Sequence, residues 1–306
     1  MNIAGYNNNL SNNKNNTLGF EARPKPYNAI NPYARYLSKY LNNSAKNSQT
    51  TIEDIIPELV GKIKNVIIRN GRTQNISAWD IPPKNSKEYV LFLHGMAQNI
   101  SNYQPLYKKI ADKNIGILAL EYRGYGANKS ARCSEYKLSK DVEKAYEYLT
   151  KEKGIEAKDI TIMGHSMGGA LAVDFAKSHK DIKSLVLIAP ITHAGHLTEK
   201  FTKNKRLGIG MPDFVYNLYE KFNPIRWLSN KNYDTLGNMK GVSTPMHIVQ
   251  SSNDSVTRVG GARELAKLAE DKGLLQSCEI IRAGGHKVDS NKVDIVSDIV
   301  GKIYQR

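Results

Sequence analysis

The sequence predicts an α/β protein with a mainly parallel, doubly wound sheet and a small helical cap. Short apolar runs rich in β-branched residues alternate with segments whose apolar residues recur at helical spacing. This alternation is typical of a parallel sheet with helices on both faces. One interval, residues 190–243, is too long for a simple crossover and predicts the cap. We place this single large domain at residues 51–306 of the 306-residue chain.

Residues 1–50 differ from the rest of the chain in composition. Asparagine dominates residues 6–16, and Glu21 is the only acidic residue before position 51. Such a segment buries too little apolar surface to offset its ordering entropy, so we expect a mostly disordered basic leader. An apolar stripe at helical spacing interrupts it, formed by Tyr33, Tyr36, Leu37, Tyr40 and Leu41. The stripe predicts a short helix that either packs on the main domain or contacts a membrane surface or a partner.

The net charge and the cysteine content limit which classes of binding partner and which cellular compartment we expect. The formal net charge is +15, yet the sequence has no Arg-rich run, zinc-ligand pattern or RNA-binding signature, so we expect no nucleic-acid partner. Cys133 and Cys278 lie far apart, which predicts neither a disulfide nor a metal site and favours a reducing, cytoplasmic compartment. We expect no transmembrane segment. The alternative location is export into another cell by a non-Sec route, with residues 1–50 as the signal.

The main domain begins with a predicted β-hairpin. Residues 66–69 and 76–79 read as strands, and Asn70-Gly71 between them is a strong signal for a short turn. Six further strands are predicted at residues 89–93, 115–120, 160–163, 185–188, 246–249 and 278–281. Helical stripes follow four of them, with apolar residues at 103–110, 142–149, 262–269 and 293–303.

The cap is expected to cover the carboxyl edge of the sheet. Within it, one helical face collects the apolar residues Phe214, Val215, Leu218, Tyr219 and Phe222. We expect Phe214, Leu218 and Phe222 either to line a substrate pocket or to dock the cap onto the core. The sequence leaves both readings open.

The stretch Gly164-His165-Ser166-Met167-Gly168 lies between a predicted strand and a predicted helix. A Gly-x-Ser-x-Gly in this position is the nucleophile elbow, a turn so sharp that glycines flank the serine. Ser166 needs a base to take its proton and an acid to orient that base. Asp254 and His286 follow the last two predicted strands, where the acid and the base of such a triad belong.

The other histidines and acids fit these roles less well. His94 and His165 lie inside motifs where packing or backbone fixing is expected, and His247 lies within a predicted strand. The remaining candidates break the chain order or suit a solvated surface, namely His179, His193, His196, Asp289 and Asp294. Donors for a developing oxyanion are expected from the backbone amides of Met96 and Met167.

These motifs together resemble a known family. The stretches 94–100 and 121–126, the pair Ser134-Glu135 with Asp141, and the Ser166 elbow are similar to the α/β-hydrolase branch that contains abhydrolase-type protein depalmitoylases and their bacterial relatives. The resemblance covers about residues 60–306. Two features depart from it, because Met96 stands where the family usually has Asn and the cap is longer. The resemblance implies an α/β-hydrolase fold and supports the Ser166, Asp254 and His286 triad residue by residue.

The expected function is a serine hydrolase that cleaves carboxylic esters or thioesters through an acyl-Ser166 intermediate. The substrate would be a small molecule or an acylated protein, and the chemistry needs no metal and no organic cofactor. A serine peptidase on the same fold and a catalytically silent binding module remain the alternatives.

Overall fold

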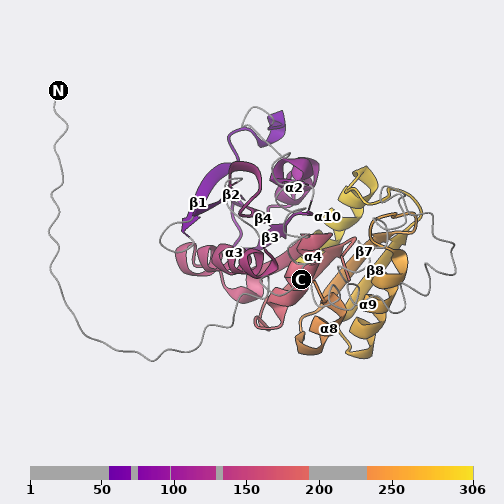
Figure 1. The fold of residues 1–306 in the computed structure, drawn as a ribbon. Coiled ribbons are helices and arrows are strands. Elements are labelled where there is room, and N and C mark those ends of the chain that lie inside the picture. Colours follow the sequence, from indigo (N-terminus) through magenta and orange to yellow (C-terminus); the bar gives the residue numbers. More distant parts are fainter. Residues whose placement is uncertain (1–54, 70–74, 97, 129–133, 193–232, 306) are drawn as a thin grey trace, which may run out of the picture.

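The computed structural model describes residues 55–69, 75–96, 98–128, 134–192 and 233–305, which form one continuous eight-stranded sheet flanked by helices (Figure 1). The strand order is β1-β2-β4-β3-β5-β6-β7-β8. Strand β2 is antiparallel to both of its neighbours, and all other neighbours are parallel. The strands are β1 (Lys64–Arg69), β2 (Asn75–Ile81), β3 (Tyr89–Leu93), β4 (Gly116–Glu121), β5 (Ile160–His165), β6 (Ser184–Ile188), β7 (Met246–Ser251) and β8 (Leu275–Ile281). The predicted mainly parallel sheet is confirmed.

The predicted hairpin is also present as a strand pair. Lys64 lies opposite Asp80 and Arg69 lies opposite Asn75 in an antiparallel register. The Asn70-Gly71 turn itself lies outside the described residues.

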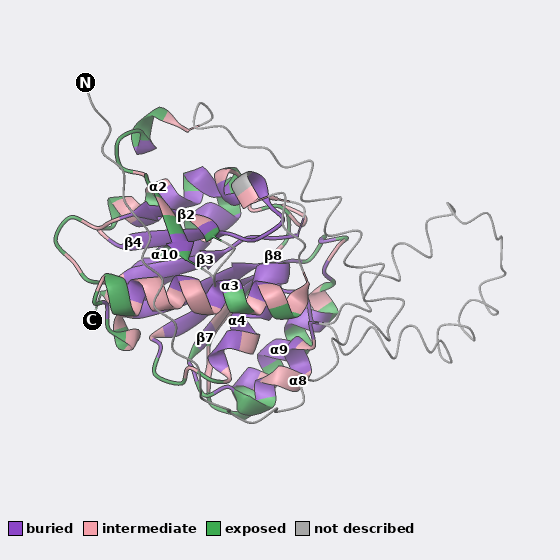
Figure 2. Cartoon of the chain, turned by 60° about the vertical axis from the view of Figure 1, so that its left-hand side comes forward, coloured by how far each residue is buried: buried purple, intermediate pink, exposed green. Residues whose placement is uncertain are grey.

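Helices cover both faces of the sheet, as predicted. Helices α3 (Glu135–Glu147), α4 (Met167–Ala176) and α9 (Val259–Asp271) pack on one face, and α2 (Gln104–Asp112) and α10 (Ser290–Tyr304) pack on the other. Alternate residues of β3 serve the two layers: Leu91 and Leu93 face the α3 layer, and Val90 and Phe92 face the α2 layer. The central strands are buried, whereas the helices carry exposed residues on their outer sides (Figure 2).

Short helical segments complete the described chain: η3 (Pro57–Leu59), η4 (Ile100–Tyr103), η5 (Gly126–Asn128), η6 (Tyr148–Glu152), η7 (Ala157–Asp159), α8 (Thr235–Asn238) and η8 (Met239–Gly241). Across the described parts of the chain, none of the helices is long and apolar enough to cross a membrane.

Two predicted regions fall largely outside the described residues. These are the leader, residues 1–50, and most of the cap, including Phe214, Leu218 and Phe222. The described ends of the cap interval meet at the sheet. The Thr235 amide donates to the Thr192 carbonyl at 3.1 Å, and the Thr235 hydroxyl donates to the Ile191 carbonyl at 2.5 Å. Residues 191–192 and 235, on the two sides of this interval, therefore lie side by side.

Glu135, the first residue of α3, binds the backbone of Tyr233, the first described residue after this interval. Its carboxylate accepts the backbone N–H of Tyr233 at 2.7 Å, and Tyr233 has a left-handed φ of 50°. Burial raises the pKa of Glu135 to about 7; the Tyr233 hydrogen bond and Lys177 oppose this rise, and the negative charges of Asp174 and Asp234 add to it.

This raised pKa predicts a pH-dependent stability. The folded state holds the Glu135 proton more tightly than the unfolded state does. The stabilisation of the fold by this proton is therefore complete below pH 4.5 and is lost as the pH rises through about 7. Glu135→Gln removes this titration. From pH 5 to pH 8, the free energy of unfolding of wild type should therefore fall by roughly 1 to 3 kcal/mol relative to that of the variant. Denaturant unfolding at both pH values measures the gain, with the exposed Glu264→Gln on α9 as control. Parallel profiles for Glu135→Gln and wild type would contradict the prediction.

Candidate active site

Ser166 sits in a strained turn between β5 and α4. Its backbone has φ 55° and ψ −115°, a region that non-glycine residues rarely occupy, and its side chain is buried. Backbone hydrogen bonds hold the turn in place, because Ser166 N donates to Ile188 O at 2.9 Å and Ile191 N donates to Ser166 O at 3.1 Å. The end of β6 therefore supports the conformation that places the Ser166 hydroxyl at the carboxyl edge of the sheet.

The flanking glycines are required by space. A Cβ at Gly164 would lie 2.2 Å from the Gly168 carbonyl oxygen, and a Cβ at Gly168 would lie 2.0 Å from the Leu93 carbonyl oxygen. Both neighbours are backbone atoms, which cannot turn aside as a flexible side chain can. The predicted need for glycine on both sides of Ser166 is confirmed.

The structure brings Ser166, His286 and Asp254 together although they lie far apart in the chain. His286 Nε2 is 3.0 Å from Ser166 Oγ, and His286 Nδ1 is 2.8 Å from Asp254 Oδ2. An ionised carboxylate only accepts hydrogen bonds, so the Nδ1–H donates to Asp254 and Nε2 is left to accept the serine proton.

Asp254 is held in its ionised form. Burial alone would raise its pKa, but the hydrogen bond to His286 and those from the Val256 and Thr257 amides, at 2.7 and 2.9 Å, outweigh burial and lower the pKa to about 2. The Thr257 hydroxyl and the Gln250 side-chain amide also donate to Oδ2, at 2.9 and 3.1 Å. Our sequence analysis missed Thr257, although an Asp in a loop often accepts a backbone N–H two residues on, as Asp254 does from Val256.

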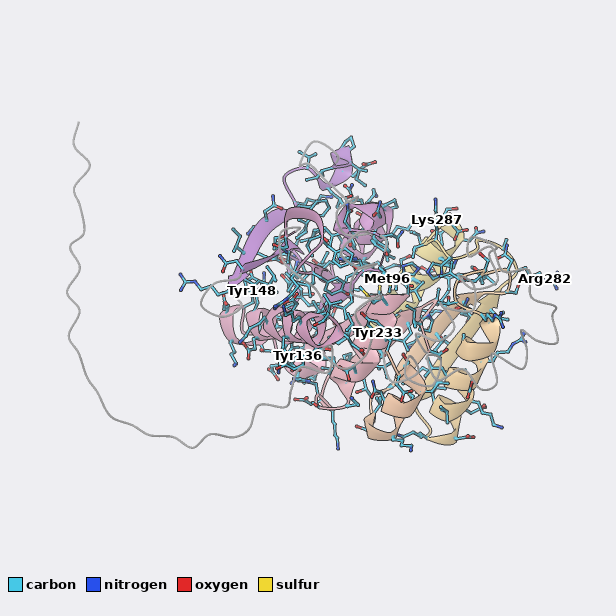
Figure 3. The ribbon with its side chains drawn as sticks, in the orientation of Figure 1. Met96, Tyr136, Tyr148, Tyr233, Arg282 and Lys287 are labelled. Carbon is cyan, nitrogen blue, oxygen red and sulfur yellow. The ribbon has the colours of Figure 1, made fainter. Side chains whose placement is uncertain are left out.

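Met167 lies in the elbow itself, and Met96 follows Gly95 in the loop that packs on it. Met167 is the first residue of α4, where a helix leaves its N–H groups without intrahelical partners. Apart from the hydrogen bonds within helices and strands, neither the Met96 amide nor the Met167 amide donates to a backbone carbonyl of the described residues. The loop that carries Met96, labelled in Figure 3, packs directly on the turn, since a Cβ at Gly95 would lie 3.4 Å from Ser166 Cβ.

His94 and His165 hold backbone groups, as the sequence predicts. His94 is fully buried with Nδ1 2.8 Å from Gly95 O and Nε2 3.1 Å from the Glu121 carboxylate. His165 Nε2 is 2.9 Å from His286 O, and its Nδ1 is 2.8 Å from the Tyr103 hydroxyl. Burial lowers the pKa of His165 to about 3, so it stays neutral. The Gly95 amide donates to the same Tyr103 hydroxyl at 3.0 Å.

The other candidates stand apart from Ser166. His247 bonds to the Ser277 hydroxyl at 2.9 Å, and burial lowers its pKa to about 4. The ring of His179 stacks on Phe175 with centroids 3.8 Å apart. Asp289 caps α10, and Asp294 pairs with Lys109 on α2. His193 and His196 lie outside the described residues.

Comparisons with known proteins agree with this architecture. The profile of the family described as "Serine aminopeptidase, S33" matches residues 84–232. A Mycoplasma pneumoniae protein named as an esterase/lipase is 30% identical over 125 residues, which cover 40% of this chain and 46% of that protein. The matched regions cover between 46% and 66% of the length of three curated relatives.

Two solved structures extend the likeness over most of the chain. An α/β hydrolase from Vibrio vulnificus superposes with a TM-score of 0.70 at 22% identity, covering 90% of this chain and 94% of that one. The Pyrococcus furiosus esterase Pf2001 superposes with a TM-score of 0.64 at 18% identity, covering 85% and 97%. The chain therefore has the α/β-hydrolase fold.

Proposed function

We propose that this protein is a serine hydrolase that cleaves carboxylic esters or thioesters through an acyl-Ser166 intermediate. The observation that carries the proposal is the pair of hydrogen bonds that joins Ser166 to His286 and His286 to Asp254 at the nucleophile elbow. The names of the matched relatives, an esterase/lipase and an esterase, support the hydrolase class. The resemblance to the depalmitoylase branch favours an acyl thioester or ester within that class.

Each described group has one task in the proposed mechanism. Ser166 Oγ attacks the carbonyl carbon while His286 Nε2 takes the hydroxyl proton, and the ionised Asp254 stabilises the imidazolium that forms. The tetrahedral oxyanion accepts hydrogen bonds from the Met96 and Met167 amides. The tetrahedral intermediate then expels the alcohol or thiol, which takes the proton from His286.

Water completes the cycle by the same steps. His286 removes a proton from the water as it attacks the acyl-Ser166 carbonyl. The second tetrahedral intermediate releases the carboxylic acid, and Ser166 Oγ regains its proton from His286. No step requires a metal ion or an organic cofactor.

The substrate, the partners and the location rest on the sequence alone. We propose that Phe214, Leu218 and Phe222 of the cap contact the acyl chain of a small-molecule or acylated-protein substrate. We further propose that the basic N-terminal region contacts a membrane surface and that the protein acts in the cytoplasm, without a nucleic-acid partner.

A peptidase is the second candidate, and the description of the matched family as a serine aminopeptidase favours considering it. The same attack on an amide carbonyl would expel an amine that leaves with the His286 proton. Activity on aminoacyl amides but not on acyl esters would support this candidate. A protein without turnover on either class, and without labelling by a fluorophosphonate, would be a binding module.

A panel of acyl esters and thioesters of graded chain length tests the proposal. We expect kcat/KM to rise from acetyl to octanoyl substrates, because each buried CH₂ contributes about 0.8 kcal/mol, close to a fourfold gain. Aminoacyl amides of matched leaving groups should react far more slowly. A profile independent of chain length would contradict the acyl-chain proposal, and preferential cleavage of the amides would contradict the esterase assignment.

A further inference from the structure

Lys292 on α10 is a lysine with no exposed side-chain surface. Buried lysines are rare, because the ammonium must find partners to offset the loss of water. Its Nζ donates to the Gly285 carbonyl at 2.8 Å and to the Lys287 carbonyl at 2.7 Å. Asp289 Oδ1 lies 3.9 Å away and adds an opposite charge. Burial lowers the pKa of Lys292, whereas the charges of Asp289 and Asp254 favour its ammonium form.

The two carbonyls that Lys292 binds lie directly before and after His286. The carbonyl of His286 itself lies 2.9 Å from His165 Nε2. Two buried side chains thus bind three consecutive carbonyls, which we call the base clamp: Lys292 at residues 285 and 287, and His165 at residue 286. Lys287, labelled in Figure 3, marks the segment that leads from this loop into α10.

The loop needs external support because its own backbone is permissive. Gly284 and Gly285 both adopt left-handed conformations, with φ of 102° and 56°. Glycines lose more conformational freedom on ordering than any other residue, so ordering a loop that begins with two of them has a high entropic cost. In addition to the clamp, the Gly285 amide donates a hydrogen bond to Asn253 Oδ1 at 3.0 Å.

The direction of each clamp bond is defined. His165 is neutral, and its Nε2–H must donate because the carbonyl of His286 can only accept. Its Nδ1, 2.8 Å from the Tyr103 hydroxyl oxygen, then carries no proton. An ammonium has donors only, so both of the Lys292 bonds also run toward the loop.

We propose that Lys292 is a positioning residue whose ammonium fixes the backbone on both sides of His286 and thereby keeps Nε2 in line with Ser166 Oγ. This inference rests on the proposed function, in which that 3.0 Å contact transfers the serine proton. Displacing a catalytic group by about 1 Å can cost on the order of 100-fold in rate.

Lys292→Met tests the base clamp. Methionine fills much of the same volume and buries no charge, so we expect a folded protein. We expect kcat per mole of folded protein to fall at least about tenfold with KM changed less than about threefold, because the base is misplaced while the binding surface is intact. Lys302→Met, an exposed lysine on the same helix, is the matched control and should keep wild-type kcat.

A double-mutant cycle separates positioning from general stability. In a His286→Ala background, Lys292→Met should lower the residual rate no further, since the base that it positions is gone. Lys292→Gln, a shorter side chain that keeps an N–H donor group, should give an intermediate kcat. Wild-type kcat in folded Lys292→Met, or an equal loss in both backgrounds, would overturn the inference. It is also overturned if neither variant folds, because Lys292 would then be required for folding.

Hydrogen exchange measures the clamp without substrate. Amides of residues 283–290 should exchange faster in Lys292→Met than in wild type, and those of β3 should be unchanged. If wild type cleaves neither esters nor thioesters, the proposed function fails while this exchange result still decides whether Lys292 orders the loop. Equal exchange in the two proteins would overturn the clamp.

Discussion

Replacing either Ser166 or His286 by alanine is expected to lower ester turnover by roughly 10⁴-fold or more, and replacing both should cost little further. The reason is that each residue works only through the other: Ser166 Oγ needs His286 Nε2 at 3.0 Å to take its proton. Steady-state kinetics of the two single variants and the double variant measure the non-additivity. Thermal unfolding of each variant shows that the fold is intact.

His179→Ala is the control for this cycle. His179 stacks on Phe175 at the end of α4 opposite to Ser166, so turnover should change by no more than a few-fold. Additive losses in the double variant, or near-normal turnover in Ser166→Ala, would show that the two residues do not act as one unit.

Gly168→Ala is expected to destabilise the fold by more than about 3 kcal/mol, beyond the usual range for overpacked cores. The new Cβ would lie 2.0 Å from the Leu93 carbonyl oxygen, so α4 would have to move away from β3. Both the nucleophile turn and the loop after β3 would shift. Denaturant unfolding measures the loss, and ester turnover should fall with it.

Gly260→Ala supplies the matched control in another helix. A Cβ at Gly260 meets nothing within 4 Å, and glycine is a poor helix former, so this variant should be unchanged or more stable by up to about 1 kcal/mol. Equal stability of Gly168→Ala and Gly260→Ala would show that the close approach of α4 and β3 is not required.

Much of the fold could be predicted because the signals are local. The apolar run at residues 89–93 coincides with β3, and the stripe that ends the chain coincides with α10. Strand ends were less predictable: β5 runs on through His165 and β7 through Ser251, since hydrogen bonds to neighbouring strands extend them beyond their apolar residues.

The candidate site shows the same division. Glycine spacing around Ser166 and the two late loops were enough to propose Ser166, Asp254 and His286 from the sequence. Lys292 and Tyr103 were missed, because a lysine at the start of a helix and a tyrosine in an apolar stripe carry no local sign of a polar partner. Lys292 does share the buried face of α10 with Val296, Ile299 and Ile303, a position where a lysine calls for an explanation.

The sequence by itself determined the alternation of strands and helices, the glycine-flanked turn at Ser166 and the residue types in the loops, since each depends on neighbours within a few positions. Only the tertiary structure decided which groups meet. His286 reaches Ser166 across 120 positions of chain, and Lys292 turns inward to the carbonyls beside His286. Such contacts depend on the parallel order of β5, β6, β7 and β8, which brings their carboxyl ends to one edge. The burial that lowers the pKa of His165 and the His286 hydrogen bond that lowers the pKa of Asp254 both follow from that packing.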